Sequence, residues 1–294
     1  LSIFSELSNL MQISMEDEYS GICGITQEEL DTTLRPCVEE YAENRHITVD
    51  EAYALLKKNY DGYRFSENGK NVYAPFSLIN ALNDKKAKYY WFESGTMSSL
   101  IEHLKHYPAF NPLDCDGVEL LLGAFNAPCE TASTPIPLLY QSGYLTIGSY
   151  DDEDQVYYLR FPNREVRQGM LDGLTNYLMD TDDLERDATI LALSRAFKRG
   201  DLSAALTELR AYIASIPYDI ITKKEWMAKK KREAFYQMLM YVIFSLLNSK
   251  VDTEVKSILG RADVVIKTKA DVFVLELKVD DTVENALAQI ENKG

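Results

Sequence analysis

The chain has 294 residues, a hydrophobic content of 46% and a formal net charge of −15 at pH 7. This length is typical of two or three domains, and the hydrophobic fraction is sufficient for buried cores. The negative charge excludes a surface that attracts nucleic acid over its whole extent, so any phosphate contact must be local. No apolar run reaches the roughly 18 residues of a membrane span, so we expect no membrane partner.

The cysteine pattern bears on metal and redox chemistry. The chain has four widely spaced cysteines, at Cys23, Cys37, Cys115 and Cys129. None forms a C-x-x-C pair, so neither zinc nor a redox motif is indicated. The three histidines form no metal-ligand cluster with them. We expect reduced, buried cysteines in a cytoplasmic protein.

The N-terminal third is predicted to be mainly helical. A Thr-x-x-Glu capping box begins at Thr26 and another begins at Thr48. In this box the threonine hydroxyl and the glutamate carboxylate each satisfy an unpaired N–H of the first helical turn. The first box predicts a helix to about Asn44 and the second a helix to about Asn59. Another helix is expected at Pro75, because proline is favoured in the first turn.

The middle of the chain combines a short helix with a hairpin. Residues 135–143 predict the helix, which ends at a glycine. Residues 144–149 and 156–161 alternate polar and apolar side chains on either side of the acidic turn 151–154. This order suggests a winged-helix-like unit. Four acids at the tip would repel phosphate, so we expect a structural or protein-contact role rather than DNA binding.

Three helices are expected next, at about residues 163–177, 184–199 and 201–215. Gly200 ends the second of them and Asp201 caps the third. The apolar spacing is typical of helices packed in pairs, which predicts a helical spacer. Four apolar side chains of this region are expected in its core: Phe197, Leu202, Leu206 and Leu209.

The C-terminal region predicts a hairpin with a polar cluster. Residues 260–266 and 271–278 are apolar and rich in β-branched side chains, and residues 267–270 separate them. Because side chains alternate along a strand, Glu276 and Lys278 are expected on one face with Val272 and Val274. Asp263 lies on the partner strand, where it can meet the pair across the hairpin.

The polar residues of this hairpin suggest metal chemistry. Two carboxylates and a lysine at the end of an apolar sheet are costly to bury without a purpose. Carboxylate oxygens are suitable ligands for Mg²⁺ or Mn²⁺. A charged strand face exposed to solvent is the alternative, because such patterns are common.

The hairpin resembles the PD-(D/E)XK nuclease superfamily, with Asp263 thirteen residues before Glu276-Leu277-Lys278. The resemblance implies a metal-dependent phosphodiesterase of α/β fold. Asp263 and Glu276 would ligate the metal. Lys278 would orient the attacking water or stabilise the developing negative charge.

The resemblance also implies supporting residues outside the hairpin. Glu233, on the helix before the sheet, would be a further acidic residue, with Glu254 on the preceding strand as its competitor. Gln289 would be the polar residue on the helix after the sheet. The basic segment 223–232 is either a phosphate contact beside this site or a solvated helix end.

A second resemblance lies near the N-terminus. The sequence motifs at residues 60–65, 72–78 and 91–96 resemble the C-terminal half of an AAA-ATPase-like module. In a largely uncharacterised bacterial family such a module is joined to the nuclease-type domain. No G-x-x-x-x-G-K-S/T phosphate loop occurs in this chain, so it should not hydrolyse ATP by itself. Arg64 is either a sensor-like arginine near nucleotide or a surface arginine stacked on tyrosines.

Together these features predict a mostly helical α/β protein. We expect the end of an ATPase-like module at residues 1–130, a winged-helix-like unit at 131–180 and a helical spacer at 181–222. A nuclease-type core, truncated after the helix of Gln289, would occupy residues 223–294. Two functions remain open: a nuclease acting on nucleic acid, regulated by its ATPase module, or a non-catalytic module that binds another protein through a degenerate nuclease fold.

Overall fold

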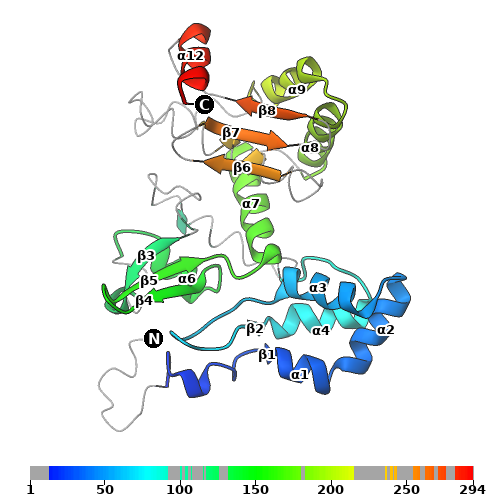
Figure 1. Cartoon of the computed structure of the whole chain (residues 1–294), viewed down its shortest axis with the longest axis vertical. Coiled ribbons are helices and arrows are strands. Elements are labelled where there is room, and N and C mark those ends of the chain that lie inside the picture. Colours follow the sequence, from blue (N-terminus) through cyan, green and yellow to red (C-terminus); the bar gives the residue numbers. More distant parts are fainter. Residues whose placement is uncertain are drawn as a thin grey trace. The chain divides into compact units, whose positions relative to one another are not determined.

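The computed structural model describes most of residues 13–91, 132–179 and 183–214, and shorter segments elsewhere. The shorter segments are residues 100, 103–104, 107, 115, 117–125, 236, 239–240, 242–243, 254–258, 262–267, 271–275 and 282–293. The chain divides into two compact units, Leu1–Met170 and Leu171–Gly294. Both contain helices and small antiparallel sheets, which agrees with the predicted α/β class (Figure 1).

The first unit begins with a group of helices that lie together in Figure 1. They are α1 (Gln27–Thr32), α2 (Arg35–Arg45), α3 (Val49–Tyr60) and α4 (Pro75–Asp84). Their shared core is built from buried side chains such as Leu30, Tyr41, Leu56 and Leu78. A short antiparallel pair, β1 (Ile25–Thr26) and β2 (Val72–Tyr73), lies beside them.

Both predicted capping boxes are confirmed. The Thr26 hydroxyl accepts from the Glu29 N–H at 3.2 Å, and the Glu29 carboxylate accepts from the Thr26 N–H at 2.8 Å. Thr48 and Glu51 repeat both bonds at the start of α3. These caps begin two helices because they satisfy donors that the first turn would otherwise leave unpaired.

The single helix predicted from Thr26 to about Asn44 is wrong, because the structure divides it into α1 and α2. Pro36 lies in the first turn of α2. A proline has no N–H to bond the carbonyl of Thr32, and its ring would clash with that carbonyl in a continuous helix. The chain therefore ends one helix at Thr32 and begins another with the proline in the first turn, where it is tolerated.

Among its described residues, the first unit also contains a three-stranded antiparallel sheet and a short helix. The strand order is β3 (Val118–Leu121), β5 (Val156–Arg160) and β4 (Thr146–Asp151). The helix is α6 (Ile136–Gln141), and the chain turns after it at Gly143, whose φ is +79°. The predicted helix and hairpin are thus present, and β3 is an additional strand that no pattern in the sequence predicts.

The motif at residues 60–65 links the helices to this sheet. Tyr63 donates its hydroxyl to the Gly143 carbonyl at 3.0 Å. The Arg64 N–H donates to the Thr146 hydroxyl, which in turn donates to the Arg64 carbonyl, each at 2.8 Å. Segments about 80 residues apart in the sequence are therefore fixed to each other by hydrogen bonds within one unit.

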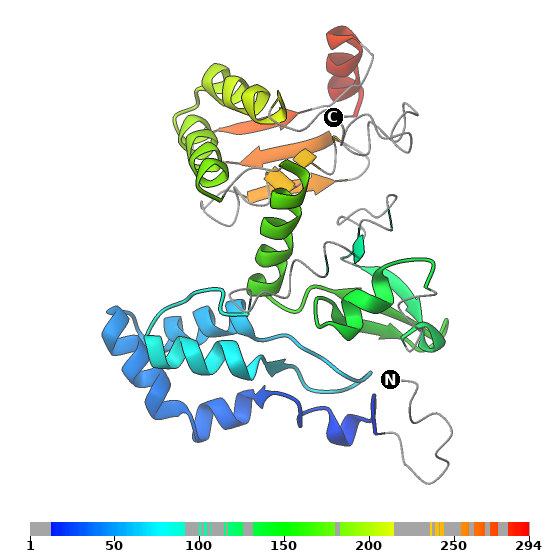
Figure 2. The same ribbon diagram turned by 180° about the vertical axis from the view of Figure 1, so that it is seen from behind.

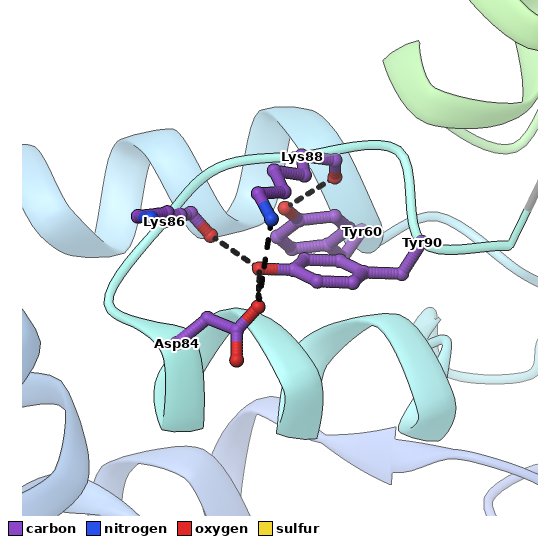
Figure 3. Close-up of polar contacts among 5 residues, drawn as sticks. All are labelled: Tyr60, Asp84, Lys86, Lys88 and Tyr90. Carbon is purple, nitrogen blue, oxygen red and sulfur yellow. Dashed lines mark hydrogen bonds and ion pairs between the residues drawn. The ribbon is translucent and has the colours of Figure 1, made fainter. Parts of the chain in front are cut away.

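Two tyrosines secure the segment that follows α4 (Figure 3). The Tyr60 hydroxyl donates to the Lys88 carbonyl at 2.8 Å. The Tyr90 hydroxyl lies 3.2 Å from both a carboxylate oxygen of Asp84 and the Lys86 carbonyl. Burial raises the pKa of the Tyr60 hydroxyl, so this residue stays a neutral donor at physiological pH.

The second unit contains helices and a second antiparallel sheet (Figure 2). Its described helices include α8 (Asp183–Lys198), α9 (Leu202–Ala214) and α12 (Val283–Lys293), and α7 (Arg164–Met179) crosses the division between the units. The sheet order is β6 (Glu254–Ile258), β7 (Ala262–Lys267) and β8 (Val272–Leu275). The three helices predicted between residues 163 and 215 are confirmed.

The core of the second unit joins α8 and α9 to the sheet. Phe197 and Leu209 are buried there, and the Phe197 ring lies 5.3 Å from the ring of Phe273 on β8. The predicted core positions Leu202 and Leu206 are wrong, because these side chains are 41% and 45% exposed. The packed stripe of α9 is Ala205, Leu209 and Tyr212, which leaves the neighbouring leucines outside it.

The described residues also bear on membrane crossing and on the burial of the cysteines. None of their helices is long and apolar enough to cross a membrane. Cys115 is buried as expected, whereas Cys23 is exposed, so the expectation of burial is wrong for that residue. Cys129 lies outside the described residues.

Candidate nuclease site

The predicted C-terminal hairpin is confirmed. Strands β7 and β8 pair in antiparallel register from Lys267 opposite Val272 to Val264 opposite Leu275. On its other edge β7 pairs with β6. The strand that carries Asp263 is therefore the central strand of the sheet, with neighbours on both sides.

The two faces of β8 have the predicted alternation. Val272 and Val274 are 61% and 41% exposed. Phe273 and Leu275 are partly buried against the core that α8 and α9 help to build. One face of the hairpin is thus a packing surface, and the other remains open within the described residues.

Asp263 belongs to the open face by its register position. It lies two residues before Val265, which is opposite Val274. Residues two apart on a strand, and residues directly opposite across a ladder, share a face. Asp263 therefore shares the face of the two exposed valines and not the face that packs on the helices.

Glu254, the competing acidic candidate, lies at the other end of the sheet. It is opposite Lys267 on β7, whereas Ile258 is opposite Ala262. Lys267 is four residues from Asp263, which corresponds to about 13 Å along a strand. The register thus separates Glu254 from Asp263 by more than one metal ion can bridge, since carboxylate oxygens bind Mg²⁺ at about 2 Å.

Of the other predicted site residues, only Gln289 lies among the described residues. Gln289 belongs to α12, a helix whose first turn is capped by the Thr282 hydroxyl accepting from the Asn285 N–H at 3.2 Å. Glu276, Lys278 and Glu233 lie outside the described residues, as does the basic segment 223–232. Within the described residues, no group of three or more His, Cys, Asp or Glu side chains could hold a metal ion.

The C-terminal region that contains the β7–β8 hairpin matches a known protein family. Residues 231–294 match the family model of the PD-(D/E)XK nuclease superfamily. The chain therefore carries a PD-(D/E)XK nuclease superfamily domain. The match includes the whole β6–β7–β8 sheet and α12. Members of this superfamily typically use divalent metal ions.

One relative matches along the whole chain. It is described as "Uncharacterized protein in vnfD 5'region" from Azotobacter chroococcum mcd 1, and it is 30% identical over an alignment of 304 positions. The alignment covers 100% of this chain and 54% of that protein, so the chain spans about half the length of this relative. No solved structure matches the chain significantly.

The first unit contains two buried carboxyls that the sequence analysis does not single out. Glu165 is fully buried at the start of α7, and its Oε1 accepts from the Trp91 N–H at 2.9 Å. Burial raises the pKa of the Glu165 carboxyl, and the Trp91 N–H opposes that rise. Burial likewise raises the pKa of the Asp61 carboxyl. No local sequence pattern predicts the burial of either residue, because segments distant in the sequence cover them.

The contacts of Arg64 differ from the expected stacking on tyrosine rings. Its Nε donates to the Ser66 carbonyl at 3.1 Å and its Nη1 to the Gly148 carbonyl at 3.3 Å. The cation–π contacts found among the described residues involve Arg45 and Lys88, so the expected stacking of Arg64 on tyrosines is not what holds it. The guanidinium is instead held by backbone carbonyls of two segments.

Proposed function

We propose that the C-terminal unit is a metal-dependent nuclease that hydrolyses phosphodiester bonds of nucleic acid. The observation that carries the proposal is the superfamily match at residues 231–294, combined with a sheet whose central strand bears Asp263 on its open face. An open sheet face at the strand that carries Asp263 would leave room for a nucleic-acid backbone, which a packed face would not.

The register supports a meeting of the two proposed metal ligands. Val264 is opposite Leu275, and Glu276 follows Leu275 in the sequence. A hairpin that keeps this register for one more pair would set Asp263 opposite Glu276. Directly opposed residues have Cβ atoms about 5 Å apart, which suits two carboxylates that share one cation.

The residue types fit a hard divalent cation. In this proposal Asp263 and Glu276 hold Mg²⁺ or Mn²⁺, because carboxylate oxygens are the ligands such ions prefer. The bound metal would polarise the scissile phosphate and lower the pKa of its water. Lys278 lies two residues after Glu276, and a strand continued through both would place them on one face. In this proposal Lys278 would orient the attacking water or stabilise negative charge as the bond breaks.

Two further residues complete the proposed site. Glu233 is the better candidate for a third acidic residue, because the register of β6 keeps Glu254 away from Asp263. Gln289 on α12 would contact the substrate or order the site through its amide. The basic segment 223–232 would supply the local positive charge that a chain of net charge −15 otherwise lacks.

We further propose that an ATPase-like module regulates this activity. The first unit carries the sequence motifs that resemble the C-terminal half of such a module, and the chain spans about half of its relative. The nucleotide-binding part would then lie outside this chain, and ATP would matter only when that part is present. The nuclease unit would have nucleic acid as substrate and its own ATPase module as partner, in the cytoplasm.

A non-catalytic interaction module is the second candidate. The exposed apolar side chains of Val272 and Val274, together with the net charge of −15, favour a surface that binds protein rather than nucleic acid. In that case the nuclease-type sheet would serve as a scaffold, and neither metal binding nor cleavage would be found.

Calorimetric titration with Mn²⁺ separates the two candidates. We expect saturable binding to this chain and its loss in the Asp263→Asn variant, which keeps the shape of the side chain but removes its charge. The matched control is Asp271→Asn, which changes an acid next to the other end of the same hairpin.

Cleavage of supercoiled plasmid and of single-stranded RNA by the same three proteins tests the activity. Cleavage that requires Mg²⁺ and Asp263 would support the nuclease. Equal Mn²⁺ binding by all three proteins would show that Asp263 is not a metal ligand. An Asp263→Asn variant that does not fold would make the residue structural, and either result would sink the proposal.

A further inference from the structure

A cleft in the first unit carries an inference that is independent of the nuclease site. It has a volume of about 550 Å³, which is within the usual range of small-molecule sites. The end of α3, the start of α1 and residues 61–71 form its walls. Eight of its nine lining residues are polar: Lys57, Arg64, Lys70, Glu28, Asp61, Asn71, Thr26 and Gln27.

Three cations face this cleft in a protein that is strongly acidic overall. Lys57 and Lys70 are exposed, and neither belongs to an ion pair among the described residues. Arg64 is held in place by its bonds to two carbonyls, and these bonds use its Nε and Nη1. Its Nη2 therefore has donors available for an oxyanion, without the entropy cost of fixing a mobile side chain.

Asp61 gives the cleft an acceptor as well. Its side chain lines the cleft although the residue is only 7% exposed, and its Oδ1 has no hydrogen-bond partner within the described residues. A buried carboxylate oxygen without a partner is costly, and such an atom in a native fold calls for an explanation. A ligand that reached this buried oxygen from the cleft and donated a hydroxyl or amine hydrogen to it would remove the cost.

The walls of the cleft are held by tight backbone packing. Gly62 has a φ of +117°, and a Cβ at this position would lie 2.1 Å from the Pro162 carbonyl oxygen. Tyr63 and Val72 exchange two backbone hydrogen bonds, at 2.8 and 3.2 Å, across the base of the 61–71 segment. Gly69 packs as closely, since an added Cβ would lie 2.2 Å from the Ser66 hydroxyl oxygen. A site formed in advance binds its ligand without first having to order its own loops.

We propose that this cleft binds a small phosphate ester that also carries hydroxyl or amine donors. Lys57, Lys70 and the Nη2 of Arg64 contact the phosphate, and the Asp61 carboxyl accepts from a hydroxyl or amine of the same molecule. Simple phosphate would satisfy only the cations and would be repelled by Asp61 and Glu28. The cleft therefore selects for a ligand with both chemical groups.

The test is calorimetric titration of the whole chain with ribose 5-phosphate, inorganic phosphate and ribose. We expect saturable binding of ribose 5-phosphate, weaker binding of inorganic phosphate and no binding of ribose. The Lys57→Ala/Lys70→Ala double variant is expected to weaken ribose 5-phosphate binding about tenfold or more, since it removes two charge-assisted contacts. Both lysines are exposed, so the fold should be retained.

Lys58→Ala is the matched control, because Lys58 is an exposed lysine of α3 that does not line the cleft. It should leave the affinity unchanged. Asp61→Asn replaces a charged acceptor by a weaker neutral one. We expect it to reduce the preference for ribose 5-phosphate over inorganic phosphate about fivefold.

Several outcomes would overturn the proposal. One is the absence of saturable binding by ribose 5-phosphate. Another is an equal loss of affinity in Lys58→Ala and in the double variant, which would indicate a general charge effect. An unchanged preference in Asp61→Asn would remove the donor requirement. If a single-stranded oligonucleotide, titrated in the same way, binds while ribose 5-phosphate does not, the cleft is a nucleic-acid surface.

Discussion

The two units of this chain place their polar residues in opposite ways. In the first unit, Tyr63 and Arg64 of the motif at residues 60–65 hold two segments of the chain together, because Tyr63 bonds the Gly143 carbonyl and Arg64 bonds strand β4. In the second unit, the β7–β8 hairpin packs its apolar face on α8 and α9 and gives Asp263 a position on the open face. A sequence motif can thus mark either a structural link or a candidate site, and its surroundings decide which.

The proposed site on the β7–β8 hairpin is tested most strongly by the Lys278→Ala variant. In the proposed nuclease Lys278 acts on the water or the developing charge and not as a metal ligand. We therefore expect cleavage to fall by about a hundredfold or more, as for other lost transition-state contacts, while Mn²⁺ binding is retained. The measurements are the plasmid-cleavage rate and the Mn²⁺ affinity.

Lys267→Ala is the control for that variant, because Lys267 lies on the same hairpin at the end away from Asp263. It should leave both quantities unchanged. A similar loss of cleavage in both variants would show that charge on the hairpin matters in general and that Lys278 has no specific role.

The packed face of the hairpin is tested by Phe197→Ala. Phe197 is buried and its ring contacts Phe273 of β8, so we expect a loss of about 3–5 kcal/mol in the free energy of unfolding. Leu206→Ala, on the exposed side of α9, should cost less than about 0.5 kcal/mol. Urea denaturation measures both, and equal losses would contradict the assignment of the core.

The inward polar groups of the first unit are tested through pH. Burial raises the pKa of Glu165 in the folded state, so the folded protein binds this proton more tightly than the unfolded chain. The Glu165 contribution to stability therefore increases as the pH falls from neutrality through the raised pKa toward the unfolded value near 4.3. It is absent at pH values well above the raised pKa.

Glu165→Gln should remove this gain, because glutamine keeps the acceptor oxygen for the Trp91 N–H but does not titrate. Thermal unfolding of both proteins between pH 7.5 and 5, as an experimental range, measures the effect. Glu153→Gln, in the exposed turn between β4 and β5, is the control and should leave the pH profile unchanged. Parallel profiles for Glu165→Gln and the unaltered chain would contradict the prediction.

The smallest expected effect concerns the capping box of α3. Thr48→Ala removes the hydroxyl that accepts from the Glu51 N–H, and we expect a loss of about 1 kcal/mol in unfolding free energy. Thr32→Ala, in the last turn of α1, removes only a bond to a carbonyl of its own helix and should cost less. A larger loss for Thr32→Ala would show that the cap does not set the stability of this region.

The candidate site could be predicted from the sequence only in part. The alternation of Val272, Phe273, Val274 and Leu275 correctly indicates the two faces of β8, because a strand has a fixed two-residue period. The choice between Glu233 and Glu254 could not be made from spacing. The pairing register separates Glu254 from Asp263, and a register depends on contacts between strands rather than on the strand itself.

The sequence by itself determined the local elements of this protein. The capping boxes at Thr26 and Thr48, the glycine that ends α8 and the β7–β8 hairpin were all predicted, because each depends on neighbouring residues. Even the break at Pro36 has a local cause, although the capping pattern alone did not reveal it.

Only the tertiary structure decided which polar groups are buried and what they contact. The addition of β3 to the sheet, the burial of Glu165 and Asp61, and the link from Arg64 to Gly148 each join segments far apart in the sequence. Burial and hydrogen bonding of this kind depend on which surfaces meet when the chain packs. Local periodicity in the sequence does not predict which distant surfaces come into contact. The cleft beside Asp61 is therefore apparent only in the folded protein.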